Sequence, residues 1–146
     1  MNQPITILLI EDNPADARLT LEAFRTSALG TKVEVREDGE SALSYLRAAD
    51  TTLPKLILLD LNLPGIDGRE VLQEIKTDDR LRAIPVCVLT TSRAEEDILQ
   101  AYYDHTNCYI VKPVDLKNFR SVIEQVETFW FQLAKVPQHL GETRST

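Results

Sequence analysis

Short apolar runs that alternate with amphipathic stretches are the feature that most limits how this chain can fold. Five runs have the length and composition of β-strands. They are Thr6–Ile10, Lys32–Arg36, Leu56–Asp60, Val86–Thr90 and Cys108–Val111. The first, third and fourth runs are apolar on both faces, which is typical of central strands in a parallel sheet that helices cover on both sides.

Stretches with helical periodicity separate these runs. They are Ala15–Thr26, Gly39–Ala49, Gly68–Asp78, Ala94–His105 and Leu116–Lys135. A strand–helix alternation repeated five times predicts an α/β fold, in which a doubly wound five-stranded parallel sheet is flanked by five helices. Right-handed crossovers leave few topologies, and we expect the flavodoxin-like strand order 2-1-3-4-5.

Length and charge limit the class of protein further. The 146 residues suit one domain, which we expect over residues 1–136, followed by a polar and disordered tail at 137–146. A net charge of −7 argues against nucleic acid as a partner, because phosphate binding needs clustered basic residues. The N-terminal apolar run is too short for a membrane or signal segment. Cys87 and Cys108 lie in apolar runs and are expected to be buried, reduced thiols. Together with the N-terminus, which lacks a signal or membrane segment, this predicts a cytoplasmic location.

Side chains suited to phosphoryl chemistry follow four of the five predicted strands. Glu11 and Asp12 follow the first strand, and Asp60 ends the third. Thr90 ends the fourth strand and Lys112 follows the fifth. Reactive groups in open parallel sheets gather at the carboxyl ends of the strands, so we expect these side chains to share one rim. Three carboxylates in close proximity need a cation, and an all-oxygen donor set favours Mg²⁺, with Mn²⁺ as a substitute.

Each of these residues also has a simpler interpretation when it is taken alone. The segment Glu11-Asp12-Asn13-Pro14 could merely cap the first predicted helix, and Asp12 could cap it as well as bind metal,. Asp60 could belong to a turn, Thr90 could be an ordinary strand residue, and Lys112 could lie on the surface. The agreement of four strand ends favours a phosphoryl-transfer site in which a carboxylate is the nucleophile.

The sequence closely resembles the receiver domain of two-component response regulators. The matching motifs are the acid pair Glu11-Asp12, the apolar strand ending in Asp60, the LPGIDG loop, Thr90, and Tyr109 with Lys112-Pro113. The resemblance covers roughly residues Ile5 to Ala134. It implies a phosphorylation-controlled signalling protein that consists of a single receiver domain and acts on an unknown downstream protein by protein–protein contact.

The resemblance also implies roles for particular residues. Asp60 would accept a phosphoryl group from a sensor histidine kinase. Glu11, Asp12 and Asp60 would hold Mg²⁺ together with the backbone carbonyl of Asn62. Such a protein is not an enzyme in the usual sense, although it would catalyse its own phosphorylation and dephosphorylation.

Three further roles concern the phosphorylated state. Lys112 would pair with the phosphoryl oxygens, and Thr90 would move to donate its hydroxyl to them. Tyr109 would turn inward as an aromatic switch when Thr90 moves. These roles are implied by the family resemblance and the matching motif positions.

A narrower resemblance is to single-domain response regulators of bacterial and cyanobacterial phytochrome kinases. It rests on the segments LILLDLNLPGIDGREVL, NCYIVKPVD and FWFQLAKVP. It implies a phytochrome-type kinase as partner and a homodimer that uses the face of the last helix. Phe129, Trp130 and Phe131 are consecutive there, and a helix rotates about 100° per residue, so the three cannot share one face. They either pack on their own domain or form the interface.

Two alternative functions belong to other classes of protein. A haloacid-dehalogenase-like phosphatase also combines a nucleophilic Asp, a hydroxyl, a Lys and Mg²⁺. That family needs a second acid two residues after the nucleophile, where this sequence has Asn62. The other alternative is a receiver-like binding module that no longer accepts phosphoryl groups, against which the intact set of site residues argues.

Overall fold

The computed structural model of the chain describes residues 6–25, 30–48, 50, 52–61, 63–90, 108–111 and 116–128. For residues 90, 108–111 and 116 it describes the backbone alone. The predicted helix at Ala94–His105 and the predicted tail at 137–146 lie outside the described residues. Within the described part, no helix is long and apolar enough to cross a bilayer.

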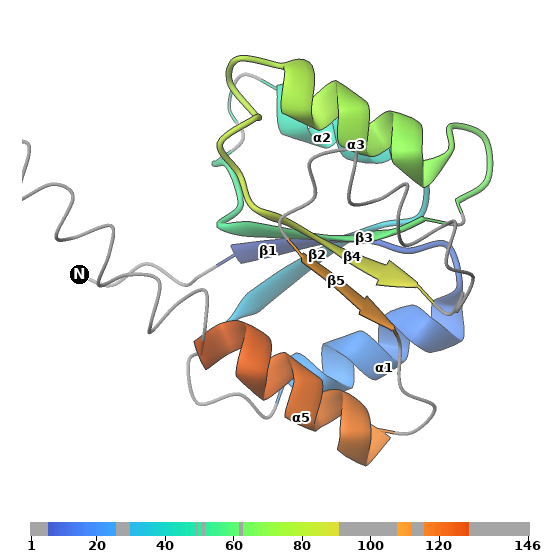
Figure 1. Cartoon of the computed structure of the whole chain (residues 1–146), viewed down its shortest axis with the longest axis vertical. Helices are drawn as coiled ribbons and strands as arrows, with labels where there is room; N and C mark the ends of the chain where they lie inside the picture. The colour runs from blue at the N-terminus through green and yellow to red at the C-terminus, as the bar shows by residue number, and fades with distance from the viewer. Residues whose placement is uncertain are drawn as a thin grey trace, which may run out of the picture.

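Five parallel strands form one sheet at the centre of the molecule (Figure 1). They are β1 (Thr6–Ile10), β2 (Lys32–Arg36), β3 (Leu56–Asp60), β4 (Val86–Thr90) and β5 (Cys108–Val111). Their order is β2-β1-β3-β4-β5, and each neighbouring pair runs parallel. This confirms the predicted doubly wound, flavodoxin-like topology. All five residues of β3 are buried, because this strand lies in the middle of the sheet with helices on both faces.

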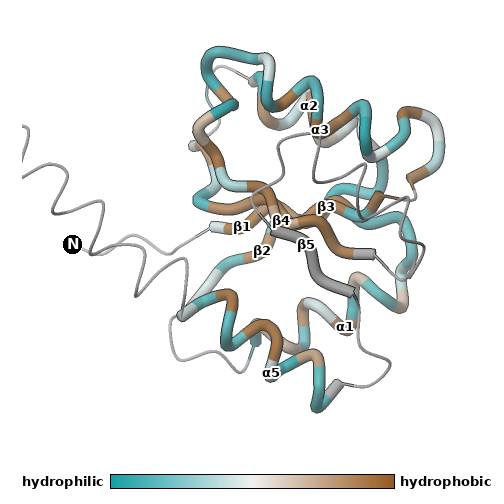
Figure 2. Tube along the Cα trace, in the orientation of Figure 1, coloured by the Kyte–Doolittle hydropathy of each residue, from teal (hydrophilic) through white to brown (hydrophobic). Residues whose placement is uncertain are grey.

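The helices cover the sheet as two layers (Figure 1). Helices α2 (Gly39–Arg47) and α3 (Gly68–Thr77) lie on one face, and α1 (Pro14–Arg25) and α5 (Leu116–Glu127) lie on the other. Successive residues of a strand therefore pack into two separate apolar clusters, one on each face of the sheet. On β1, for example, Leu8 packs toward α2 and α3 whereas Leu9 packs toward α1 and α5. Figure 2 shows the hydrophobic residues concentrated in the strands between these layers.

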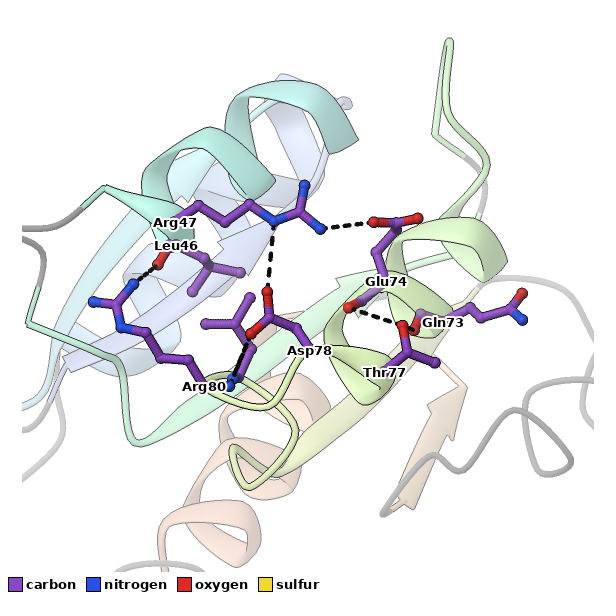
Figure 3. A network of polar contacts seen from close by, with 8 residues as sticks. Leu46, Arg47, Gln73, Glu74, Thr77, Asp78 and Arg80 are labelled. Carbon is purple, nitrogen blue, oxygen red and sulfur yellow. Dashed lines mark hydrogen bonds and ion pairs between the residues drawn. The ribbon is translucent and has the colours of Figure 1, made fainter.

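Helix α2 begins at the predicted residue and ends two residues before the predicted end. Asp38 caps its first turn, as expected from the Asp-Gly pair. The prediction extended the helix to residue 49, but it ends at Arg47, and Ala48 is extended with ψ 132°. The guanidinium of Arg80 donates to the carbonyl of Leu46 at 3.0 Å (Figure 3). It also donates to the carbonyl of Ala48 at 3.4 Å. A long-range contact thus satisfies the carbonyl groups at the end of α2.

Charged side chains join α2 to α3 on the outside of the molecule (Figure 3). The guanidinium of Arg47 lies 2.6 Å from a carboxylate oxygen of Glu74 and 3.7 Å from one of Asp78. Arg47 and Glu74 are each about half exposed. Solvent and salt weaken such pairs, so this network aligns the two helices without dominating the stability of the fold.

For Cys87, the prediction of a buried residue is correct and the prediction of a reduced thiol is wrong. Cys87 lies in the middle of β4 and is fully buried, but it is disulfide-bonded in this structure. Its register partner on β5 is Cys108, the only other cysteine of the sequence. The sequence alone could not reveal this, because it does not tell which strands are neighbours or how they are aligned.

Candidate functional site

Three carboxylates converge at the carboxyl edge of the sheet. Glu11 and Asp12 follow directly after β1, and Asp60 is the last residue of β3. These strands are neighbours, with Ile10 opposite Leu59. One ligand oxygen from each carboxylate lies within 4.8 Å of the others. The predicted convergence of these three acids is therefore confirmed.

The environments of the three acids differ. Glu11 is 1% exposed and Asp60 is 7% exposed, whereas Asp12 is open to solvent. Glu11 is held because its backbone N–H donates to the carbonyl of Arg36 at 2.9 Å, which extends the contact between β1 and β2. The backbone N–H of Asn13 also donates to the Glu11 carboxylate at 3.3 Å. The cluster therefore has two buried carboxylates, Glu11 and Asp60, and one solvent-accessible carboxylate, Asp12.

The donor chemistry of this cluster fits a hard divalent cation. All three side chains offer carboxylate oxygens, the ligands that Mg²⁺ and Mn²⁺ prefer. Carboxylates this close repel one another unless a cation or a proton compensates them. Glu11, Asp12 and Asp60 are therefore the residues that would hold such an ion.

Helix α1 is capped by Asn13 and not by Asp12. The side-chain oxygen of Asn13 accepts hydrogen bonds from the backbone N–H groups of Ala15 at 2.9 Å and Asp16 at 3.1 Å. These are the donors that an N-cap residue is expected to satisfy. The alternative in which the acid pair serves only as a helix cap is thus wrong for Asp12.

Asp67, Gly68 and Gly65 stabilise the turn after β3. Asp67 caps α3 by accepting from the backbone N–H of Arg69 at 2.9 Å. The backbone N–H of Gly68 donates to the carbonyl of Leu61 at 3.2 Å, which closes the loop. Gly65 has φ +67°, the left-handed conformation that glycine adopts readily,. These contacts account for the turn chemistry of the LPGIDG loop.

Gly68 is a residue of the site that the sequence reasoning missed. A Cβ at this position would lie 2.6 Å from the carbonyl oxygen of Asp60 and 2.6 Å from the Cα of Leu61. Real Cβ atoms do not approach other heavy atoms so closely. Only glycine therefore allows α3 to begin against the end of β3. The signal available in the sequence was the Asp-Gly pair that closes the LPGIDG loop.

The backbone brings the ends of β4 and β5 to the same edge. Asp60 is in register with Leu89, and Thr90 is the next residue and the last of β4. Thr90 is in register with Val111, which directly precedes Lys112 in the sequence. The side chains of Thr90 and Tyr109 lie outside the described part of the structure. So do the whole residues Asn62, Lys112, Phe129, Trp130 and Phe131.

Comparison with known proteins identifies the class to which this fold and site belong. A family profile described as the response regulator receiver domain matches residues 7–124. The chain belongs to this family of phosphoacceptor signalling proteins.

Particular relatives include response regulators of phytochromes. The crystal structure of the phosphorylated cyanobacterial phytochrome response regulator RcpA is 45% identical, with a TM-score of 0.84, over 90% of this chain and 96% of that chain. The response regulator Rcp1 of Synechocystis sp. is 43% identical over 93% of this chain and 95% of its own length. A crystal structure of Rcp1 in its Mn²⁺-bound form has a TM-score of 0.80 and 44% identity, over 88% of this chain and 96% of that chain.

A relative of comparable identity has a name that refers to methanogenesis. The probable methanogenesis regulatory protein FilR2 of Methanothrix harundinacea is 42% identical over 92% of this chain and 88% of its own length. Relatives with different names therefore align with this chain over most of its length. The present chain is a receiver-domain response regulator related to the phytochrome response regulators.

Proposed function

We propose that Asp60 is the phosphoacceptor of this response regulator and that Glu11, Asp12 and Asp60 hold the divalent cation that the reaction needs. The convergence of these three carboxylates at the carboxyl edge of the sheet supports this assignment. Of the three, Asp60 ends the fully buried strand β3. A rigid strand holds a nucleophile in one orientation, which favours attack on an incoming phosphoryl group.

The proposed reaction moves one phosphoryl group. A carboxylate oxygen of Asp60 attacks the phosphorus atom of a phosphohistidine. The phosphorus–nitrogen bond breaks, its electron pair stays with the imidazole, and an acyl phosphate forms on Asp60. A bound Mg²⁺ or Mn²⁺ would neutralise charge on the phosphoryl oxygens. We assign Lys112 and Thr90 to contacts with those oxygens, because the backbone register brings the ends of β4 and β5 to the edge that carries Asp60.

The metal assignment has support of two kinds. The cluster supplies only oxygen donors, which suits Mg²⁺ and its substitute Mn²⁺,. The relative Rcp1 has a structure in an Mn²⁺-bound form. We further propose the backbone carbonyl of Asn62 as a ligand, and Tyr109 as the switch residue that follows Thr90.

Incubation with acetyl phosphate and Mg²⁺ tests the assignment of Asp60. Intact mass spectrometry under conditions that preserve acyl phosphates should show a gain of one phosphoryl group. The gain should be absent in Asp60→Asn and without divalent cation. Asp79→Asn is a suitable control, because the side chain of Asp79 is 94% exposed on a loop. If Asp60→Asn is still phosphorylated to the wild-type level, the assignment is wrong.

The same samples separate the alternative functions. A phosphatase would turn over small phosphate monoesters many times, and this turnover would be lost in Asp60→Asn. A phosphorylation-independent binding module would show no mass gain at all. The proposed response regulator should gain one phosphoryl group and then lose it by catalysing its own dephosphorylation.

We propose a phytochrome-type histidine kinase as the partner, with a cytoplasmic location and output by contact with a downstream protein. The name of the relative RcpA, a cyanobacterial phytochrome response regulator, supports this kinase class. Phosphotransfer profiling should show fastest transfer from a phytochrome kinase when a panel of purified sensor kinases is compared. Fastest transfer from a kinase of another class would contradict the partnership.

We also propose that Phe129, Trp130 and Phe131 form a homodimer interface. The helical pattern of the sequence extends over these residues to Lys135, and a helix rotates about 100° per residue, so three consecutive aromatic residues cannot share one face,. Analytical ultracentrifugation should show a dimer that Trp130→Ala weakens. Exposed Leu21→Ala on α1 serves as a control of similar kind. A wild-type monomer at high concentration, with and without acetyl phosphate, would rule the interface out.

A further inference from the structure

A pair of cysteines joins two of the strands that lead to the site. Cys87 lies in the middle of β4, is fully buried, and packs in the apolar cluster shared with α1 and α5. It is disulfide-bonded, and its register partner Cys108 is the first residue of β5 and the only other cysteine of the chain. Neither cysteine belongs to the carboxylate site, so the proposed function leaves both unexplained.

The backbone register alone makes this pair suitable for a covalent link. Neighbouring strands lie about 4.8 Å apart, and residues in register on parallel strands project to the same face. Disulfides join residues whose Cα atoms are roughly 4.4–6.8 Å apart. A bond between Cys87 and Cys108 therefore needs little displacement of β4 or β5.

We propose that Cys87 and Cys108 form a reversible disulfide that fastens β5 to β4 and makes phosphorylation of this protein sensitive to thiol–disulfide balance. A low-molecular-weight disulfide such as oxidised glutathione is the oxidant. The two protein thiols lose two protons and two electrons, the protein S–S bond forms, and the S–S bond of oxidised glutathione breaks to give two glutathione thiols.

The edge position of β5 allows reagents to reach Cys87 and Cys108. β5 lies at the end of the strand order, and among the described strands only β4 pairs with it. An edge strand opens locally at a lower free energy than a central one. Because Cys87 is fully buried, exchange should occur through this opening and proceed slowly compared with an exposed thiol.

The bond lies close to residues that we assign to the phosphoryl group. Thr90 is three residues after Cys87, and Lys112 is four residues after Cys108. A covalent link opposes any relative displacement of the two strand ends. If Thr90 moves on phosphorylation, as the family resemblance implies, the link disfavours the phosphorylated arrangement. This consequence rests on the proposed function, whereas formation of the bond does not.

Thiol counting tests the bond, with the full-length protein equilibrated in reduced or in oxidised glutathione. The oxidised sample should have no free thiol on denaturation, two hydrogen masses less than the reduced sample, and a monomeric mass on a non-reducing gel. Its melting temperature should be higher by about 5 °C or more, because the bond closes a long chain segment. Two free thiols, or a disulfide-linked dimer, would overturn the proposal.

Phosphorylation by acetyl phosphate and Mg²⁺ tests the coupling. The phosphorylated fraction at a fixed acetyl phosphate concentration should be at least twofold lower in the oxidised protein. Cys87→Val and Cys108→Ala should each show the same fraction under both conditions, since neither can form the bond. Equal fractions in oxidised and reduced wild type would overturn the coupling. Absence of phosphorylation in reduced wild type would instead contradict the proposed function.

Discussion

Gly68 begins α3 so close to Asp60 that a Cβ on the glycine would lie 2.6 Å from the carbonyl oxygen of the aspartate. The neighbouring atoms are backbone atoms of Asp60 and Leu61, so no flexible side chain can move aside. The first turn of α3 thereby determines where β3 ends. The position of the proposed phosphoacceptor thus depends on a residue that takes no part in the chemistry.

Replacement of this glycine should affect both stability and the site. Gly68→Ala forces the strand end and the helix start apart, and overpacking of this kind costs about 1–3 kcal/mol of unfolding free energy. The displacement of Asp60 should also weaken Mn²⁺ binding and slow phosphorylation by acetyl phosphate, each about tenfold or more. Urea unfolding, an Mn²⁺ titration and phosphorylation kinetics measure the three effects.

Gly39→Ala is the matched control for this prediction. Its Cβ would lie 2.5 Å from Cγ2 of Val71, so the new contact is with a side chain between α2 and α3. We expect a loss of stability with Mn²⁺ affinity close to that of the wild type. An equal loss of Mn²⁺ affinity in Gly68→Ala and Gly39→Ala would mean that general destabilisation, and not the position of Asp60, is responsible.

The carboxylate cluster predicts opposite effects of one substitution with and without metal. Asp12 is the exposed member of the cluster, and Asp12→Asn removes one of three mutually repelling charges. Without divalent cation the variant should be more stable than the wild type, by up to about 1 kcal/mol. With Mg²⁺ the order should reverse, because the wild type binds the ion more tightly and gains more from it.

Melting curves in EDTA and in a Mg²⁺ series measure this reversal. Asp79→Asn removes a charge far from the cluster in sequence and should show the wild-type response to Mg²⁺. The metal assignment fails if Asp12→Asn and the wild type gain the same stability from Mg²⁺ over the whole series.

Asp38 predicts a specific dependence of stability on pH. Hydrogen bonds from the backbone N–H and then the side chain of Ser41 lower the pKa of Asp38 below its usual value of 3.8. The charged form is therefore favoured in the folded protein. Its stabilising contribution is present above pH 3.8 and is lost as the pH falls through the lower folded-state pKa,.

Two substitutions separate the charge of Asp38 from its role as a cap. Asp38→Asn keeps an acceptor for the N–H of Ser41 and does not titrate, so its melting temperature should fall less than that of the wild type between pH 5 and pH 2. Asp38→Ala removes the cap and should melt lower at neutral pH as well. If the melting temperatures of Asp38→Asn and the wild type fall equally between pH 5 and pH 2, the lowered pKa of Asp38 does not contribute to stability.

The pair between Arg47 and Glu74 should contribute little despite its short distance of 2.6 Å. Both side chains are about half exposed, and such pairs contribute about 0.2–1 kcal/mol. A double-mutant cycle with Arg47→Ala and Glu74→Ala should give a coupling in that range which shrinks in 1 M salt. A coupling well above it would show that the α2–α3 contact is a main source of stability.

The sequence alone was enough to predict the strands and the acids of the site. All five strands begin and end at the predicted residues, because short apolar runs between turn residues are strong local signals. Glu11, Asp12 and Asp60 were predicted to meet, since parallel strands bring their carboxyl ends to one edge,. These inferences needed only periodicity and the rules of parallel sheets.

Tertiary structure decided the remaining points, and each depends on contacts between residues distant in sequence. The end of α2 at Arg47 involves Arg80, more than thirty residues later. The requirement for glycine at 68 arises because α3 starts against the backbone of β3. The disulfide of Cys87 depends on the alignment of Cys87 on β4 with Cys108 on β5. Local sequence patterns indicate which secondary-structure element forms. The close approach of two backbones and the register between strands are determined only when the elements pack together.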